Sequence, residues 1–101
     1  MVVEDVQVDE FKKHMIGEFL LIDVRTDEEY VRGNIDGSKL IPVHELEDRL
    51  HELDHYREKK ILVYCRSGAR SMVAVGILFE NGFKNIVNLA GGYRAWASFA
   101  H

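Results

Sequence analysis

Short runs of consecutive apolar residues alternate along this chain with segments of helical periodicity. The runs at 19–22 and 61–64 are apolar throughout, as expected of central strands that helices cover on both faces. Residues 86–89 form a third run, and residues 2–6 and 39–41 are weaker strand candidates. Because strands that alternate with helices usually build βαβ units, this order predicts an α/β domain with a parallel sheet.

Capping signals place two of the helices between these strands. The first helix is expected to begin at Asp9 as N-cap and to stop at Gly17, because short polar side chains cap helix starts and glycine ends them. Thr26 and Glu29 have the spacing of a capping box, and Gly33 is expected to end that short helix.

Two further helices are indicated by apolar spacing. Residues 72–79 are surrounded by apolar neighbours and predict a buried helix that ends near residues 81–82. A surface helix packed by one apolar stripe is expected after Pro42, with the stripe formed by Val43, Leu46, Leu50 and Leu53.

Residues 51–55 spell the His-Glu-x-x-His pattern of zinc proteases. At 100° per residue, His51 and His55 turn roughly 120–160° away from the leucine stripe, toward solvent. A catalytic zinc needs a third ligand and a sheltered cavity, so no metal site is expected.

The length and charge of the chain limit its functions. Its 101 residues are expected to form a single domain spanning 1–101. A net charge of −4 without long runs of like charge gives no global field that would recruit nucleic acid or an anionic membrane. The single cysteine excludes an internal disulfide, and no leader or membrane-spanning stretch is seen. We therefore expect a cytoplasmic protein, and the sequence leaves its oligomeric state open.

The most informative segment follows the apolar run at 61–64. Cys65 comes directly after this run and lies at the start of a short loop that leads into the expected buried helix. A strand-loop-helix turn directs backbone N–H groups and the positive helix end toward one point, and such surroundings lower a thiol pKa. Gly68 lets the loop curl, and Arg66 and Arg70 add positive charge. Cys65 is therefore predicted to be a nucleophile, with the substrate-binding loop formed by Arg66, Ser67, Gly68, Ala69 and Arg70.

This loop resembles the active-site loop of rhodanese-like domains, which has a cysteine, a glycine three residues on and a basic end. The likeness continues in order through residues 22–30, 33–42 and 91–96. The chain departs from the family pattern where Asn34 replaces the usual histidine, and the other departures are Asp36 for proline and Ser38 for alanine. The resemblance implies a rhodanese-like three-layer sandwich, with a five-stranded, mainly parallel sheet and helices on both faces.

The resemblance also implies a sulfurtransferase of the thiosulfate type. The Cys65 thiolate would take sulfane sulfur from thiosulfate or a persulfide donor and hold it as a covalent persulfide, without any other cofactor. Because the chain has no second cysteine, the acceptor must be external: cyanide, a small thiol or a thioredoxin-like protein.

Two alternatives use the same cysteine. A persulfide carrier would pass sulfur between proteins, and a Cys/Arg phosphatase or arsenate reductase would act on an oxyanion. Four residues separate Cys65 from Arg70, whereas the phosphatase loops have five. The shorter loop favours sulfur over phosphate, because fewer inward N–H groups would surround the phosphate oxygens.

Two residues outside the loop, Asp23 and Arg25, are supporting candidates. Asp23 and Arg25 follow the run at 19–22, and a parallel sheet would bring them to the same edge as Cys65. Asp23 is expected to pair with an arginine or cap a loop rather than to contact substrate, while both roles stay open for Arg25. Tyr93 and Trp96 are expected to pack a final helix.

Overall fold

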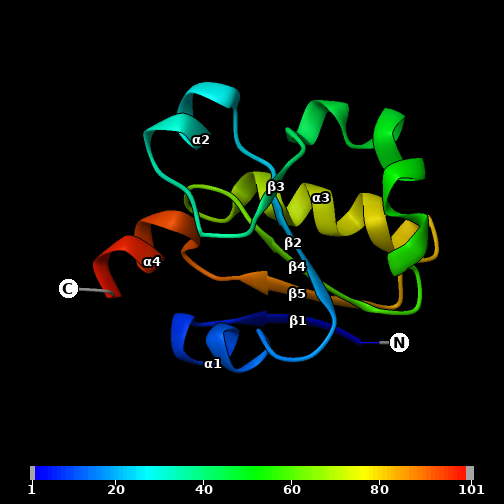
Figure 1. Cartoon of the computed structure of the whole chain (residues 1–101), viewed down its shortest axis with the longest axis horizontal. Helices are drawn as coiled ribbons and strands as arrows, with labels where there is room; N and C mark the ends of the chain where they lie inside the picture. The colour runs from blue at the N-terminus through cyan, green and yellow to red at the C-terminus, as the bar shows by residue number, and fades with distance from the viewer. Residues whose placement is uncertain (1, 100–101) are drawn as a thin grey trace.

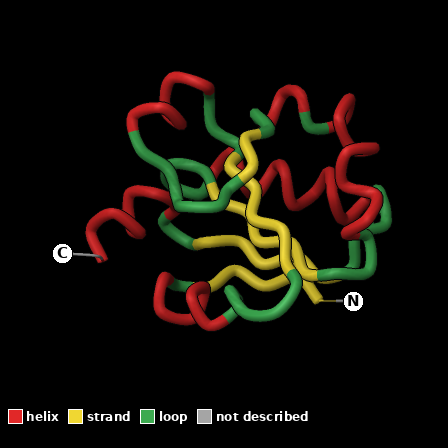
Figure 2. The backbone as a smooth tube through the Cα atoms, in the orientation of Figure 1, coloured by secondary structure: helices red, strands yellow, loops and turns green. Residues whose placement is uncertain are grey.

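Residues 2–99 are described by the computed structural model, and in this part of the chain five strands form one parallel sheet (Figures 1 and 2). The strand order is β1-β5-β4-β2-β3, and neighbouring strands pair in parallel. The predicted five-stranded α/β fold is therefore confirmed. The strands are β1 (Val2–Val6), β2 (Phe19–Asp23), β3 (Lys39–Leu40), β4 (Lys60–Tyr64) and β5 (Asn85–Leu89).

Helices cover both faces of this sheet and complete three layers (Figure 1). Helices α1 (Val8–Lys13) and α4 (Gly92–Phe99) lie on one face. Helix α3 (Ala69–Glu80) and the 3₁₀ helices η1 (Val43–Glu45) and η2 (Glu47–Tyr56) lie on the other. Helix α2 (Asp27–Arg32) sits at the edge of the sheet where the strands end.

The alternation of side chains along β4 divides the interior into two cores. Ile61 and Val63 point to the face covered by α3, and the side chain of Cys65 lies in the same core cluster. Leu62 and Tyr64 point to the face covered by α1 and α4. Because successive strand residues face opposite sides, the position of Cys65 one residue past β4 directs its thiol toward α3.

The segment after Pro42 folds differently from the expected α-helix. It forms η1 and η2, whose backbone hydrogen bonds span three residues, as from Leu46 N–H to the Val43 carbonyl. Leu50 and Tyr56 pack against the core cluster on either side of the buried Leu53. The three-residue spacing of Leu50, Leu53 and Tyr56 matches the three residues per turn of a 3₁₀ helix.

Two further helix predictions need correction. Helix α1 begins at Val8, with Gln7 rather than Asp9 as its N-cap, and it ends at Lys13, before the predicted stop at Gly17. The prediction that α3 is buried is wrong for its outer face, where Met72 and Val73 are about half exposed (49% and 58%). The sheet covers only one side of α3, and no element in residues 2–99 forms a fourth layer over the other side.

Both ends of α2 and the C-terminal end of α3 form as expected. Thr26 and Glu29 make a complete capping box at the start of α2, and Gly33 is its C-cap. Helix α3 ends with Asn81 as C-cap. Because all strands run in parallel, β2 and β4 deliver Asp23 and the Cys65 loop to the same edge of the sheet. Within residues 2–99, the helices are too short or too polar to cross a bilayer.

Candidate functional site

The Cys65 thiol lies at the centre of the turn that joins β4 to α3. Its side chain is almost fully buried (1% exposed). The Gly68 backbone N–H donates a hydrogen bond to Sγ over 3.0 Å. The thiol in turn lies 3.4 Å from Ser71 Oγ, which donates to the Gly68 carbonyl over 3.0 Å. The loop therefore closes around the sulfur, and Ser71 joins it to the first turn of α3.

Burial and hydrogen bonding act in opposite directions on the acidity of this thiol. Burial raises the pKa of Cys65, because it penalises the charged thiolate. A hydrogen bond with the Ser71 hydroxyl, together with those from the backbone N–H groups of Ser71, Gly68 and Ser67, lowers it, and their combined effect leaves the pKa of Cys65 below its ordinary value. A thiol with a lowered pKa forms the nucleophilic thiolate more readily at neutral pH.

Two glycines allow the backbone to adopt this shape. Gly68 has φ of 119°, in the region that favours glycine, and it is the N-cap of α3. Gly92, at the start of α4, has φ of 57°, and a Cβ there would collide with the Cys65 carbonyl and the Arg66 backbone. The backbone N–H groups of Tyr93 and Arg94 donate to the Cys65 and Arg66 carbonyls over 2.7 and 3.0 Å.

The start of α4 therefore holds the loop from the side of the second core. This role of Gly92 was not predicted from the sequence. The motif at residues 91–96, which resembles the family pattern, was the one sequence signal that could have pointed to Gly92. The close approach of two backbones far apart in sequence appears only in the folded chain.

Arg70, predicted as a binding cation, is paired with α2. Its guanidinium donates two hydrogen bonds to the Glu29 carboxylate, over 2.6 and 2.8 Å. This pairing lowers the pKa of Glu29 to about 2, with a further contribution from the Thr26 cap and against a smaller opposing effect of burial. Glu29 was expected only as a capping residue, and its second role depends on the packing of α2 against the loop.

Asp23 and Arg25 form a buried ion pair beside the loop. Arg25 Nη2 donates to Asp23 Oδ2 over 2.7 Å and to the Gly33 carbonyl over 2.7 Å. The guanidinium lies over the rings of Tyr64 and Tyr93, at 5.5 and 4.5 Å from their centroids. Asp23 pairs with Tyr64 in the strand register, so this ion pair lies on the opposite face of the sheet from the thiol. The pairing of Asp23 with an arginine is thus observed.

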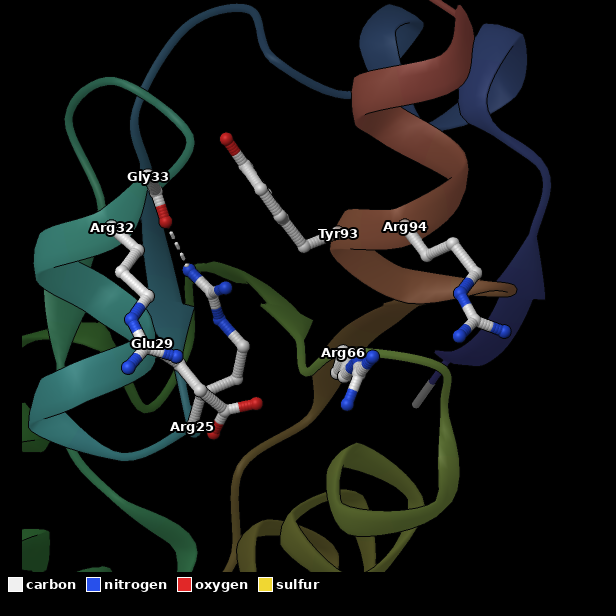
Figure 3. Close-up of a pocket in the computed structure, with 7 residues that line it drawn as sticks. All are labelled: Arg25, Glu29, Arg32, Gly33, Arg66, Tyr93 and Arg94. Carbon is white, nitrogen blue, oxygen red and sulfur yellow. Dashed lines mark hydrogen bonds between the residues drawn. The ribbon is translucent and has the colours of Figure 1, made fainter.

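The other loop residues point outward. Arg66, Ser67 and Ala69 are exposed, and Arg66 lines a cleft of about 370 Å³ between α2 and α4 (Figure 3). Arg25 and Tyr93 also line this cleft. The structure thus gathers the predicted residues at one edge of the sheet, and substrate contact by the loop residues remains a prediction.

The three positions that depart from the family pattern differ in burial, since Ser38 is buried while Asn34 and Asp36 are exposed. Ser38 is buried, with Oγ 3.0 Å from the Tyr64 hydroxyl, and that hydroxyl also accepts from Ile35 N–H. Asn34 donates to the Tyr30 carbonyl, and Asp36 is exposed. Ser38 therefore helps to attach the segment after α2 to β4.

Trp96, Tyr93 and His55 make contacts with other side chains of the fold. Trp96 packs edge-on against Phe11, with ring centroids 6.4 Å apart. Tyr93 both packs on Tyr64 and lines the cleft. His55 is exposed, with Nε2 3.2 Å from Glu18 Oε2. Within residues 2–99, no group of three or more histidine, cysteine, aspartate or glutamate side chains is placed to hold a metal ion.

The fold and the loop define an α/β domain with a cysteine of lowered pKa at the carboxyl edge of its sheet. The chain matches the rhodanese-like domain family over residues 7–99. The protein therefore belongs to the rhodanese-like domain family.

Relatives of the chain include named sulfurtransferases and solved rhodanese-like structures. A sulfurtransferase from Allochromatium vinosum is 38% identical over 78 residues, which cover 77% of this chain and 71% of that protein. A putative sulfur carrier protein, YrkF, from Bacillus subtilis is 34% identical over 93% of this chain, which spans only 51% of that relative. The crystal structure of a rhodanese-like domain protein from Staphylococcus aureus superposes with a TM-score of 0.82 at 34% identity, covering 92% of this chain and 90% of that one.

Proposed function

We propose that this protein is a sulfurtransferase that carries sulfane sulfur as a persulfide on Cys65. The observation that carries the proposal is the loop geometry, in which the Gly68 N–H donates to Sγ over 3.0 Å and Ser71 Oγ lies 3.4 Å away. These groups lower the thiol pKa and remain in place to stabilise an anionic sulfur. Membership in the rhodanese-like family, with relatives named sulfurtransferases, supports the same activity.

In the first half-reaction the Cys65 thiolate attacks the outer sulfur of thiosulfate or of a persulfide donor. With thiosulfate, the bond between the two donor sulfurs breaks, sulfite leaves with the electron pair, and a Cys65 persulfide anion forms. The total charge is unchanged. The new outer sulfur would extend from the buried Sγ toward the mouth of the loop.

In the second half-reaction an external nucleophile removes that outer sulfur. The acceptor attacks it, the bond to Cys65 Sγ breaks, and the Cys65 thiolate is regenerated. Because the chain has a single cysteine, the nucleophile comes from an external acceptor such as cyanide, a small thiol or a thioredoxin-like protein. No metal or organic cofactor enters either step.

A persulfide carrier is the second candidate, because a relative is named a putative sulfur carrier. A carrier would form the same adduct and transfer it to a protein without appreciable turnover on small acceptors. A phosphatase or arsenate reductase ranks lower, because only four residues separate Cys65 from Arg70 and Arg70 is paired with Glu29.

Mass spectrometry and turnover assays test the proposal together. The intact protein is incubated with thiosulfate and weighed, and turnover is followed with thiosulfate plus cyanide and, separately, with a phosphate ester. We expect wild type to gain one sulfur atom and to turn over thiosulfate, and Cys65→Ser to do neither. Trp96 fluorescence, compared between the two proteins, checks that the variant is folded.

Each other outcome selects a different function. Adduct formation without turnover on small acceptors would favour the carrier. Wild type that gains no sulfur from thiosulfate or a persulfide donor, yet hydrolyses the ester, would contradict sulfur transfer.

A further inference from the structure

The outer face of α3 is an apolar surface that residues 2–99 leave uncovered. Met72, Val73 and Phe79 are about half exposed there, whereas Ala74 and Leu78, on the opposite side of the helix, are fully buried. At 100° per residue the outward positions fall within an arc of about 120° that is centred on Gly76. This outer face is formed by Ala69, Met72, Val73, Gly76, Phe79 and Glu80.

Gly76, at the middle of the outer face, is not required by the fold of the single chain. It lies inside a helix and its φ is not positive. Apart from its own stretch of helix, a Cβ at this position would meet nothing within 4 Å. Glycine inside a helix costs about 0.5–1 kcal/mol relative to alanine. Close approach by a second backbone from outside the chain gives the glycine a use.

The charge distribution along α3 favours a second copy of the chain as the occupant of this face. Residues 71–79 contain no charged side chain, in a protein in which 30% of the residues are charged. In a two-fold symmetric dimer the same surface meets itself, so a charged surface would meet its own like charges, whereas a neutral one avoids this repulsion. A membrane fits less well, because interfacial helices have lysine and arginine beside the apolar face. Here Glu80 lies at that edge, and Arg70 is paired with Glu29.

We propose that two copies of this protein associate through the outer face of α3, with the two helices antiparallel and crossing at Gly76. Met72 precedes Gly76 by four residues and Phe79 follows it by three, on the same side of the helix. Each Met72 would therefore meet Phe79 of the second copy, and contacts between a thioether and an aromatic ring are favourable. This inference goes beyond the proposed sulfur chemistry and does not depend on it.

Val73 and Glu80 lie on the other side of Gly76, three residues before it and four residues after it. In the antiparallel pair each Val73 would lie against the methylene groups of Glu80 from the second copy. The two Glu80 carboxylates would be about 12 Å apart along the helix axes, which exceeds the Debye length of about 8 Å at physiological salt. The arrangement therefore brings no like charges together.

The contact is small, so the dimer is expected to be weak. The outer face extends over about three helical turns, which bury less than the roughly 800 Å² per partner of a standard stable complex. We therefore expect a dissociation constant in the micromolar range or above, and the measurement has to reach high protein concentrations.

Sedimentation equilibrium over a range of protein concentrations tests the dimer, with reductant present so that no disulfide joins two Cys65 thiols. The mass of wild type should rise from 11.6 kDa toward twice this value. Gly76→Gln should weaken association by at least about tenfold, because the new side chain would hold the two backbones apart. At low concentration the same variant should be at least as stable to urea as wild type, because the space around Gly76 is open. A glycine needed only for the fold would instead make the variant less stable.

Two charge substitutions test the register of the helices. Val73→Glu sets a carboxylate against Glu80 of the second copy and should weaken association by at least about tenfold. Adding Glu80→Lys should restore most of the association, because each new carboxylate then faces a lysine. Residues 73 and 80 are seven positions apart, too far for an ion pair within one helix. Val31→Glu changes an exposed valine of α2 and is the matched control, expected to leave association unchanged.

Four results would overturn the proposal. Wild type that keeps a mass of 11.6 kDa up to about 500 µM does not form even a weak dimer. A dimer that persists in both Gly76→Gln and Val73→Glu uses another surface. Association that is lost in Val73→Glu and not recovered with Glu80→Lys contradicts an antiparallel crossing at Gly76. Monomeric wild type that sediments with phosphatidylserine vesicles, when Val73→Glu does not, would assign the outer face to a membrane.

Discussion

At Cys65, burial and hydrogen bonding act on the thiol in opposite directions, and the hydrogen bonds prevail. The burial comes from the position of Cys65 at the end of β4, with its side chain directed into the core beneath α3. The hydrogen bonds come from the loop itself, through backbone N–H groups and the Ser71 hydroxyl. The reactivity of the cysteine thus depends on a loop of neighbouring residues and on a core built from residues far apart in the sequence.

Ser71→Ala should raise the pKa of Cys65. The lost hydrogen bond is worth about 1 kcal/mol, which corresponds to a roughly fivefold smaller ratio of thiolate to thiol at a given pH. The pH profile of Cys65 alkylation by iodoacetamide measures this change, and its inflection should move toward the ordinary thiol value. Ser98→Ala, an exposed serine of α4, is the control, and an inflection in Ser71→Ala equal to that of wild type would contradict the role of Ser71.

Among the elements, α2 and α3 are joined across the site by the Glu29–Arg70 ion pair. Glu29 also completes the capping box of α2 with Thr26. One carboxylate therefore stabilises a helix start and positions the basic end of the Cys65 loop. Helices α2 and α3 are far apart in the sequence. Their connection therefore requires the sheet to bring both helices to one edge.

Glu29→Gln should destabilise the protein by about 1–2 kcal/mol at pH 7, a figure reduced for solvent screening because Arg70 is about a third exposed. The pKa of Glu29 is lowered to about 2 from 4.5, so this contribution is present above about pH 4.5. It is lost as the pH falls from 4.5 toward 2. Urea unfolding at a series of pH values should therefore show wild type and variant converging in acid.

Glu28→Gln provides the matched control for that experiment. Glu28 is the exposed neighbour of Glu29 on α2, and it forms no salt bridge with any residue in 2–99. Its substitution should leave the stability within about 0.5 kcal/mol of wild type. A difference between Glu29→Gln and wild type that stayed constant from pH 7 to pH 2 would contradict the ion-pair explanation.

Residues 2–99 pack into two cores, one on each face of the sheet, and the site depends on both. The core beneath α3 holds the Cys65 side chain, while the core beneath α1 and α4 includes Tyr64 and supports the backbone that clamps the loop. Phe11 and Trp96 join α1 to α4 in this second core. Loss of packing there should weaken the fold as a unit.

Phe11→Ala should lower the free energy of unfolding by about 3–5 kcal/mol, as is typical when a fully buried phenylalanine leaves a cavity. Urea unfolding at pH 7, followed by Trp96 fluorescence and by circular dichroism, measures the change. Val31→Ala, at a side chain that is 79% exposed, should shift stability by less than about 0.5 kcal/mol. A loss below about 1 kcal/mol in Phe11→Ala would contradict the assigned packing.

The strands, the capped start of α2 and the position of the Cys65 loop could be predicted before the fold was known. These features follow from local physics: continuous apolar runs, the capping pair of Thr26 and Glu29, and a glycine three residues after the cysteine. The sequence also predicted that Asp23 would reach the same edge as Cys65, because parallel strands end together. Apolar spacing alone did not distinguish a 3₁₀ helix from an α-helix after Pro42.

Which side chains meet at the site became clear only in the folded chain. It paired Arg70 with Glu29, set Gly92 against the Cys65 backbone, and left Arg32, Arg66 and Arg94 around one cleft without carboxylate partners in residues 2–99. It also left the outer face of α3 exposed. The sequence did not predict this exposure, because apolar composition does not say how many layers will cover a helix. Contacts between residues far apart in the chain depend on how the layers pack, and local sequence patterns do not encode that packing one segment at a time.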